Sequence, residues 1–168
     1  IILIAFESWD NLKDKKLLKK YVFIAVIVAT ILFIWSNSFR NSSSSMNSSN
    51  SIKAMILSIF EYFGFDIRDT FFIHFIRKFG HFTEYFALGF ELIIFRNVYY
   101  RDNKAAILNC FYIGAFSAFL DETIQLIPSL GRSAEVTDVW IDISGILLAF
   151  LIVIFIKFLS SKIHFRRK

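Results

Sequence analysis

Long apolar runs separated by short polar stretches dominate the pattern of the chain. Four of these runs approach the roughly 20 residues that a helix needs to cross a bilayer, and they cover about residues 21–38, 79–95, 105–127 and 139–156. The strict alternation of a membrane β-strand is absent, and a single span satisfies its backbone in lipid only as a helix. The pattern therefore predicts an all-α, polytopic membrane protein with about four transmembrane helices.

A long connection lies between the first two apolar runs. Residues 37–51 are rich in Ser and Asn and lack apolar periodicity, which predicts a loop. Residues 52–65 place apolar side chains at helical spacing, but this stretch is too short to cross a bilayer. We therefore expect a short amphipathic helix there that lies on the membrane surface or re-enters the membrane.

The composition agrees with a membrane protein. The chain of 168 residues is 56% hydrophobic and only 20% charged, whereas soluble domains contain about 45–50% apolar and about 25% charged residues. This apolar excess predicts that the lipid bilayer is the main partner. The single cysteine, Cys110, falls in an apolar run and is expected to be an inert buried thiol.

The basic residues are distributed unevenly along the chain. Thirteen of the 19 Lys and Arg residues fall within residues 1–20, 96–104 and 157–168. This asymmetry is typical of membrane topology rather than of a nucleic-acid-binding surface, so no nucleic-acid partner is expected. The positive-inside rule places these segments, and with them both termini, in the cytoplasm. The predicted organisation is a basic cytoplasmic segment at 1–20, a single membrane domain at 21–160 and a basic cytoplasmic tail at 161–168.

Ionisable residues gather near the helix ends that this topology places outside. Arg77, His81 and Glu84 share one face of the second predicted helix, because they are spaced by four and three residues. The third and fourth helices each carry a similar stripe. An ionisable cluster inside a membrane is a functional-site hypothesis by default. The candidate ligand-binding residues are Arg77, Lys78, His81, Glu84, Asp121, Glu122, Gln125, Arg132, Asp138 and Asp142.

Several chemistries fit these residues, and the pattern leaves them open. One is a structural ion-pair network that holds three helices together. Others are an anion site on Arg77, Lys78 and Arg132, acid–base catalysis by His81, and a proton relay that continues to Glu91. A metal site is weakly indicated because His81-x-x-Glu84 lacks a second histidine nearby, so no metal and no cofactor is predicted. Whether the protein is an enzyme is left open.

The order of these motifs resembles that of a known family. The segment Arg77-Lys78-x-x-His81-x-x-Glu84-Tyr85 is followed by Asp121-Glu122-x-x-Gln125, then by Gly131-Arg132, Asp138 and Gly145, and this is similar to the VanZ-like integral membrane proteins. Asp142 is a departure, because most members carry Asn there.

The resemblance implies a role at the outer face of the cytoplasmic membrane. It implies antibiotic resistance, specifically to the glycopeptide teicoplanin, or another cell-envelope process. The implied partners are a glycopeptide, a lipid-linked precursor or a cell-wall precursor. The alternatives are a membrane enzyme that acts on such a precursor and a structural, partner-binding membrane module.

Overall fold

The computed structural model describes residues 2–39, 70–127 and 136–166, together with positions 54, 55, 58 and 62. Four long helices make up most of these residues: α1 (Ile2–Ser38), α3 (Thr70–Tyr99), α4 (Ala105–Gln125) and α5 (Val136–Arg166). No strand occurs in these ranges, so the prediction of an all-helical fold is confirmed for them. Arg132 and most of the predicted amphipathic helix at 52–65 lie outside the described residues.

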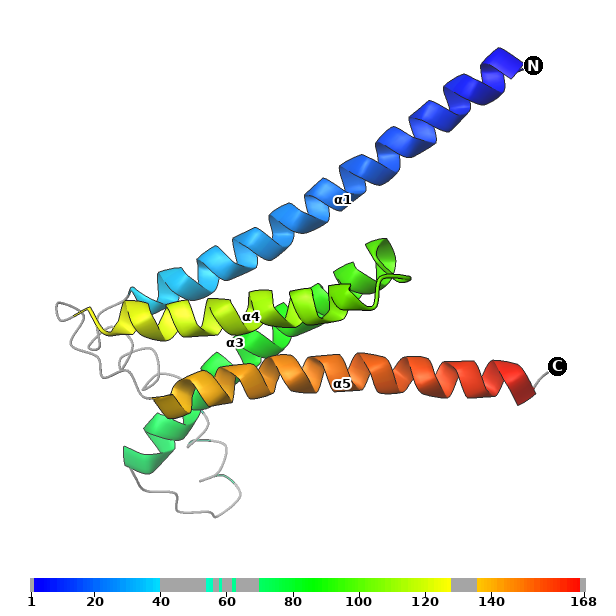
Figure 1. Cartoon of the computed structure of the whole chain (residues 1–168). Helices are drawn as coiled ribbons and strands as arrows, with labels where there is room; N and C mark the ends of the chain where they lie inside the picture. Colours follow the sequence, from blue (N-terminus) through cyan, green and yellow to red (C-terminus); the bar gives the residue numbers. More distant parts are fainter. Residues whose placement is uncertain are drawn as a thin grey trace.

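Successive helices run in opposite directions (Figure 1). Ile2, the turn between α3 and α4 and the C-terminal end of α5 lie at one end of the bundle, which we call the terminal end. The C-terminal end of α1, the C-terminal end of α4 and the start of α5 lie at the opposite end, which we call the cluster end. The three segments with most of the basic residues therefore share the terminal end.

Within the described residues, three helical segments are long and apolar enough to cross a membrane: Asp14–Ser38, Ala105–Gln125 and Val136–Ser160. The protein is thus a multi-pass membrane protein. Helix α3 is 30 residues long but is not among the three. Its stripe of ionisable residues, which includes His81, Glu84 and Glu91, makes it less apolar than its neighbours. The predicted fourth span at 79–95 therefore stays a prediction.

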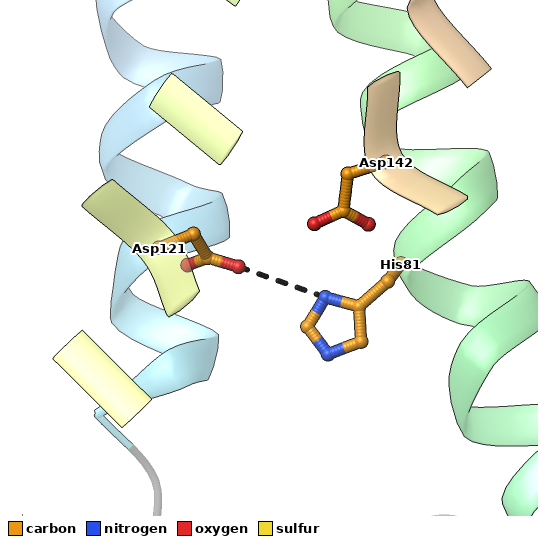
Figure 2. A group of neighbouring side chains, drawn as sticks. All are labelled: His81, Asp121 and Asp142. Carbon is orange, nitrogen blue, oxygen red and sulfur yellow. Dashed lines mark ion pairs between the residues drawn. The ribbon is translucent and has the colours of Figure 1, made fainter. Parts of the chain in front are cut away.

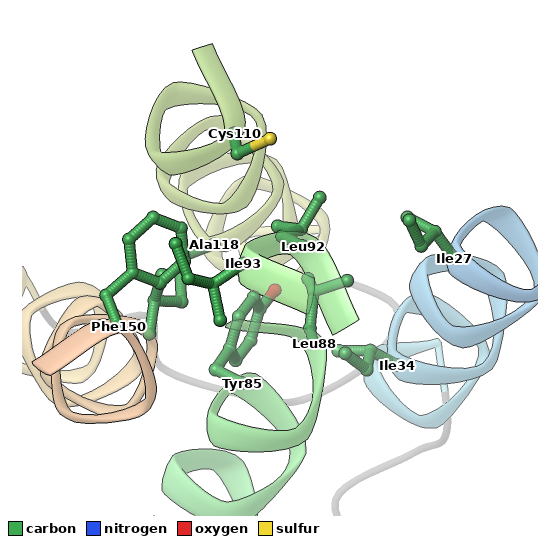
Figure 3. Close-up of a cluster of buried hydrophobic side chains, with 10 residues drawn as sticks. Ile27, Ile34, Tyr85, Leu88, Leu92, Ile93, Cys110, Ala118 and Phe150 are labelled. Carbon is green, nitrogen blue, oxygen red and sulfur yellow. The ribbon is translucent and has the colours of Figure 1, made fainter. Parts of the chain in front are cut away.

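Helix α3 is nevertheless central to the packing, since it contacts α1, α4 and α5. It supplies four side chains of the buried apolar cluster, more than any other helix (Figure 3). The members of this cluster are Ile27 and Ile34 of α1, Tyr85, Leu88, Leu92 and Ile93 of α3, Cys110 and Ala118 of α4, and Ile146 and Phe150 of α5. The burial of Cys110 agrees with the sequence-based expectation.

The contact of α3 with α5 is the most extensive in the bundle, and two glycines permit it. A Cβ atom on Gly145 would lie 2.5 Å from the carbonyl oxygen of Phe82, and one on Gly89 would lie 2.7 Å from the Cα of Ile146. Small residues let helix backbones approach closely in lipid, where packing replaces the hydrophobic effect as the driving force.

The face of α3 opposite its ionisable stripe is aromatic. Successive rings stack at centroid separations from 6.0 to 6.5 Å. The stacked residues are Phe75, Phe79, Phe82, Phe86 and Phe90. This series is offset by two residues from the ionisable stripe, which corresponds to about 200° around a helix. Helix α3 thus has one polar face toward its neighbours and one aromatic face.

Candidate functional site

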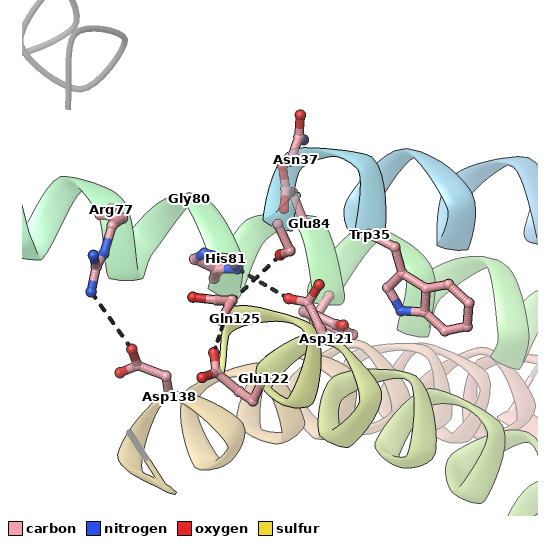
Figure 4. A network of polar contacts seen from close by, with 12 residues as sticks. Trp35, Asn37, Arg77, Gly80, His81, Glu84, Asp121, Glu122, Gln125 and Asp138 are labelled. Carbon is pink, nitrogen blue, oxygen red and sulfur yellow. Dashed lines mark hydrogen bonds and ion pairs between the residues drawn. The ribbon is translucent and has the colours of Figure 1, made fainter. Parts of the chain in front are cut away.

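Seven polar side chains from α3, α4 and α5 form a group at the cluster end; Figure 4 labels all of them except Asp142, which Figure 2 labels. Five of them are nearly inaccessible to solvent, with exposed fractions of 5% or less: Asp121, Glu122, Gln125, Asp138 and Asp142. The other two, His81 and Glu84, are partly buried. We call these seven residues the polar cluster. The structure places nine of the ten predicted site residues in or beside it, and Arg132 lies outside the described part of the chain.

An ion-pair group forms one edge of the polar cluster. Lys78 Nζ lies 2.7 Å from one carboxylate oxygen of Asp138, and an Arg77 guanidinium nitrogen lies 3.8 Å from the other. Asp138 is also in the first turn of α5, where the helix dipole stabilises a negative charge. These contacts clamp α3 to α5. Because Arg77 and Lys78 both face Asp138, they are less available to an external anion than their spacing in the sequence suggests.

The C-terminal end of α1 forms a second edge. The Asn37 amide donates a hydrogen bond to Glu84 at 2.9 Å, and the Gln125 amide donates to Glu122 at 3.1 Å and to Ser38 at 3.5 Å. Asn37 and Ser38 were predicted both at the end of the first apolar run and at the start of the loop. The structure places them in α1, where they complete the network, although neither was among the candidate site residues. The available signal was a pair of polar residues directly after an apolar run.

Aromatic residues close the side of the polar cluster that faces the apolar cluster. The Tyr85 hydroxyl and the Trp35 indole N–H both donate to the backbone carbonyl of Ser117, at 3.1 and 3.3 Å. Tyr85 is fully buried. Tyr85, which follows Glu84 in the sequence motif, therefore also packs α3 against α4.

His81, Asp121 and Asp142 lie close together within the polar cluster, one residue from each of three helices (Figure 2). His81 Nδ1 lies 3.7 Å from Asp121 Oδ2, and one ligand atom from each residue lies within 4.8 Å of the others. Asp121 and Asp142 are fully buried. Neither carboxylate oxygen of Asp142 accepts a hydrogen bond from a described residue. This trio can hold a cation, share a proton or act as an acid–base pair.

Two other features lie outside the polar cluster. Glu91 accepts a hydrogen bond from the Thr30 hydroxyl at 3.0 Å, so it joins α1 to α3. An apolar groove of about 470 Å³ lies toward the terminal end between α1 and α3, where Val22, Phe23 and Tyr99 line it. Neither feature brings several ionisable groups together, so the polar cluster is the stronger candidate site.

Comparison with known proteins identifies the family to which the chain belongs. The family model described as VanZ/LLP1 matches residues 21–157. Comparison with curated proteins and with solved structures finds no match. The family match covers α3 and α4, the C-terminal part of α1, most of α5 and every residue of the polar cluster, and it confirms the resemblance noted in the sequence. The chain belongs to the VanZ/LLP1 family.

Proposed function

We propose that this protein acts on cell-envelope material at the outer face of the cytoplasmic membrane through its polar cluster. The orientation follows from the basic residues, most of which fall in the segments at the terminal end. The positive-inside rule places that end in the cytoplasm and the polar cluster outside. In this topology α3 is the fourth span, with its aromatic face toward lipid and its polar face toward the bundle.

The observation that carries the proposal is the concentration of five carboxylates between three helices. Four are buried (Asp121, Glu122, Asp138 and Asp142), and Glu84 is partly buried. A charge at the centre of a bilayer costs about 2.5–3.5 kcal/mol on insertion scales. Helices can pack in lipid through small residues without this cost, and Gly89 and Gly145 already do so here. A concentration of charge beyond what packing requires favours a binding role.

The proposed ligands are a glycopeptide such as teicoplanin, its cell-wall target or a lipid-linked precursor. The VanZ resemblance favours this class over other envelope components. The test measures teicoplanin susceptibility of a sensitive Gram-positive host. The host expresses the wild-type chain, the Glu84→Ala variant or the Asp121→Ala variant at matched protein abundance. Asp102→Asn, in the exposed turn at the terminal end, is the control. We expect wild type and control to protect and both cluster variants to fail.

Equal protection by all four proteins would refute a role for the polar cluster, and no protection by wild type would refute the glycopeptide assignment. The orientation has its own test. A periplasmic-type reporter fused after Ile127 should be active, whereas the same reporter fused after Asp102 should be inactive. The reverse pattern would place the polar cluster in the cytoplasm.

An enzyme that acts on a lipid-linked precursor is a second candidate. The observation that favours it is the approach of His81 to Asp121, because a carboxylate can orient a histidine for proton transfer. Catalysis predicts turnover of such a precursor by purified protein and its loss in His81→Ala. Full turnover by His81→Ala would remove His81 from the reaction.

A further inference from the structure

We infer that His81, Asp121 and Asp142 form a binding site for a divalent cation. The inference rests on the proposed function of the polar cluster and names the class of ligand that its centre takes. The sequence analysis predicted no metal because no second histidine stands near His81. The structure supplies the missing donors from two other helices, a combination that spacing along one helix cannot reveal.

The separations fit a single ion. Zinc and similar ions lie about 2.0–2.2 Å from imidazole nitrogen and carboxylate oxygen. Two donors at about 2.1 Å from one ion and 3.7 Å apart subtend an angle of about 120°, and 3.7 Å is the separation of His81 Nδ1 and Asp121 Oδ2. The third donor, from Asp142, completes a group whose ligand atoms all lie within 4.8 Å of one another. Donors about 2.1 Å from one ion are at most about 4.2 Å apart, so the inference requires side-chain rotations that draw any wider pair of donors together.

Asp142 gives an independent reason to expect a cation. Its side chain is fully buried and points toward His81 and Asp121 (Figure 2). No described residue donates a hydrogen bond to either of its carboxylate oxygens. A buried carboxylate without donors is strongly unfavourable unless a counter-charge or a proton neutralises it. Among the described residues, Arg77 and Lys78 are the Arg and Lys side chains beside the cluster, and both form ion pairs with Asp138.

The position of Asp121 at the C-terminal end of α4 is a further reason to expect a bound cation. It lies four residues before the C-terminal residue of α4, Gln125, and Glu122 follows it directly. The C-terminal end of a helix carries the negative end of its dipole, so carboxylates are disfavoured there. Asp138 shows the contrast, because it lies at the favourable end of α5 and has two basic partners. A bound cation would offset the unfavourable field at Asp121.

The donor set indicates which ions to test. Calcium and magnesium prefer all-oxygen ligands, whereas imidazole with carboxylates suits first-row transition metals. We therefore expect Mn²⁺ or Zn²⁺ to bind more tightly than Ca²⁺ or Mg²⁺. The inferred cation site does not depend on which side of the membrane the polar cluster faces, because all three ligands come from the folded bundle.

The test is metal binding by the purified full chain in detergent. After treatment with a chelator, wild type is titrated with Mn²⁺ and with Zn²⁺, and the bound metal is counted after desalting. We expect about one ion per chain. Asp142→Asn replaces the anionic ligand by a neutral amide of the same size, and His81→Gln removes the imidazole ligand. Each should weaken binding at least about 10-fold, which corresponds to about 1.4 kcal/mol.

The matched control is Glu91→Gln. Glu91 is also on α3 and partly buried, but it pairs with Thr30 outside the polar cluster. The control should bind as wild type does, and metal should raise the melting temperatures of wild type and control alike. If Asp142→Asn does not fold, Asp142→Glu takes its place and should retain binding with altered affinity.

Two results would overturn the inference. One is the lack of binding to wild type at millimolar metal, and the other is equal binding by wild type, Asp142→Asn and His81→Gln. Binding without antibiotic protection would leave the cation site standing and refute only the glycopeptide assignment.

Discussion

The contacts of α5 and of α1 with α3 differ in kind. Helix α5 packs closely through Gly145 and Gly89 and is clamped by the ion pairs of Asp138. Helix α1 meets its neighbours mainly near its C-terminal end and diverges from them toward its N-terminal end (Figure 1). Only 11% of its membrane-length segment is buried, against 33% in α4 and in α5.

This difference teaches how each helix is held in lipid. Apolar side chains gain little by leaving lipid for protein, so close packing and directional polar contacts must hold the bundle together. Helices α3 and α5 are held together by both close backbone packing and ion pairs. Helix α1 has hydrogen bonds from Thr30, Trp35 and Asn37, with little close packing toward its N-terminal end. The C-terminal end of α1, beside the polar cluster, is therefore held more firmly than the part that diverges toward the N-terminal end.

The largest expected effect comes from Gly145→Ala. The added Cβ would lie 2.5 Å from the Phe82 carbonyl oxygen and 3.0 Å from the Phe86 backbone nitrogen, so α3 and α5 must separate. Overpacking of this kind costs about 1–3 kcal/mol or more, and we expect about 3 kcal/mol because backbone atoms cannot rotate away. Thermal unfolding in detergent measures the loss.

Gly80→Ala is the control for that substitution, since a Cβ at Gly80 meets nothing within 4 Å. Alanine also favours helix over glycine by about 1 kcal/mol, so the control should be as stable as wild type or slightly more stable. Equal stability of the two variants would mean that α3 and α5 do not approach closely at Gly145.

The next effect comes from Lys78→Met. Removing one partner of a buried ion pair costs about 3–5 kcal/mol, but Lys78 is 29% exposed and Arg77 remains beside Asp138, so we expect about 1–2 kcal/mol. The cost should shrink when Asp138→Asn is already present, because no carboxylate is then left without its partner. A double-mutant cycle on unfolding free energies measures the coupling, and additive losses would exclude the clamp.

Periodicity in the sequence was enough to predict which helix faces are buried. Asp138, Asp142, Gly145 and Ala149 form the expected stripe on α5, and all four are buried. Gly114, Ser117 and Ala118 are likewise buried on α4. These predictions are confirmed because a face depends only on 3.6-residue spacing.

Periodicity could not predict which residues meet across helices. The pairing of Arg77 and Lys78 with Asp138, and the approach of Asp142 to His81, depend on how far each helix slides and turns against the next. The role of Asn37 was missed for a related reason. A polar residue at the end of an apolar run is indistinguishable from a loop residue until its partner, Glu84, is known.

Asn37→Ala should have a moderate effect on stability and a larger one on the polar cluster. Its amide is a hydrogen-bond donor to Glu84 from α1, and bonds to charged groups contribute about 1.5–3 kcal/mol when buried. This contact is only partly buried, so we expect about 1 kcal/mol of stability to be lost. Antibiotic protection, if the chain confers it, should fall further than stability does, because Glu84 loses its orientation. Asn109→Ala, at an exposed position on α4, is the control and should change neither.

The smallest effect should come from Thr30→Val, which sharpens the contrast between the two halves of α1. The substitution keeps the branched shape but removes the donor to Glu91 at 3.0 Å. Interhelical hydrogen bonds in membranes average about 0.6 kcal/mol, so the unfolding free energy should fall by about that amount. Antibiotic protection and metal binding should not change, because this contact joins α1 to α3 away from the polar cluster. If Thr30→Val weakened protection as much as Asn37→Ala does, the whole of α1, rather than its C-terminal end, would govern the site.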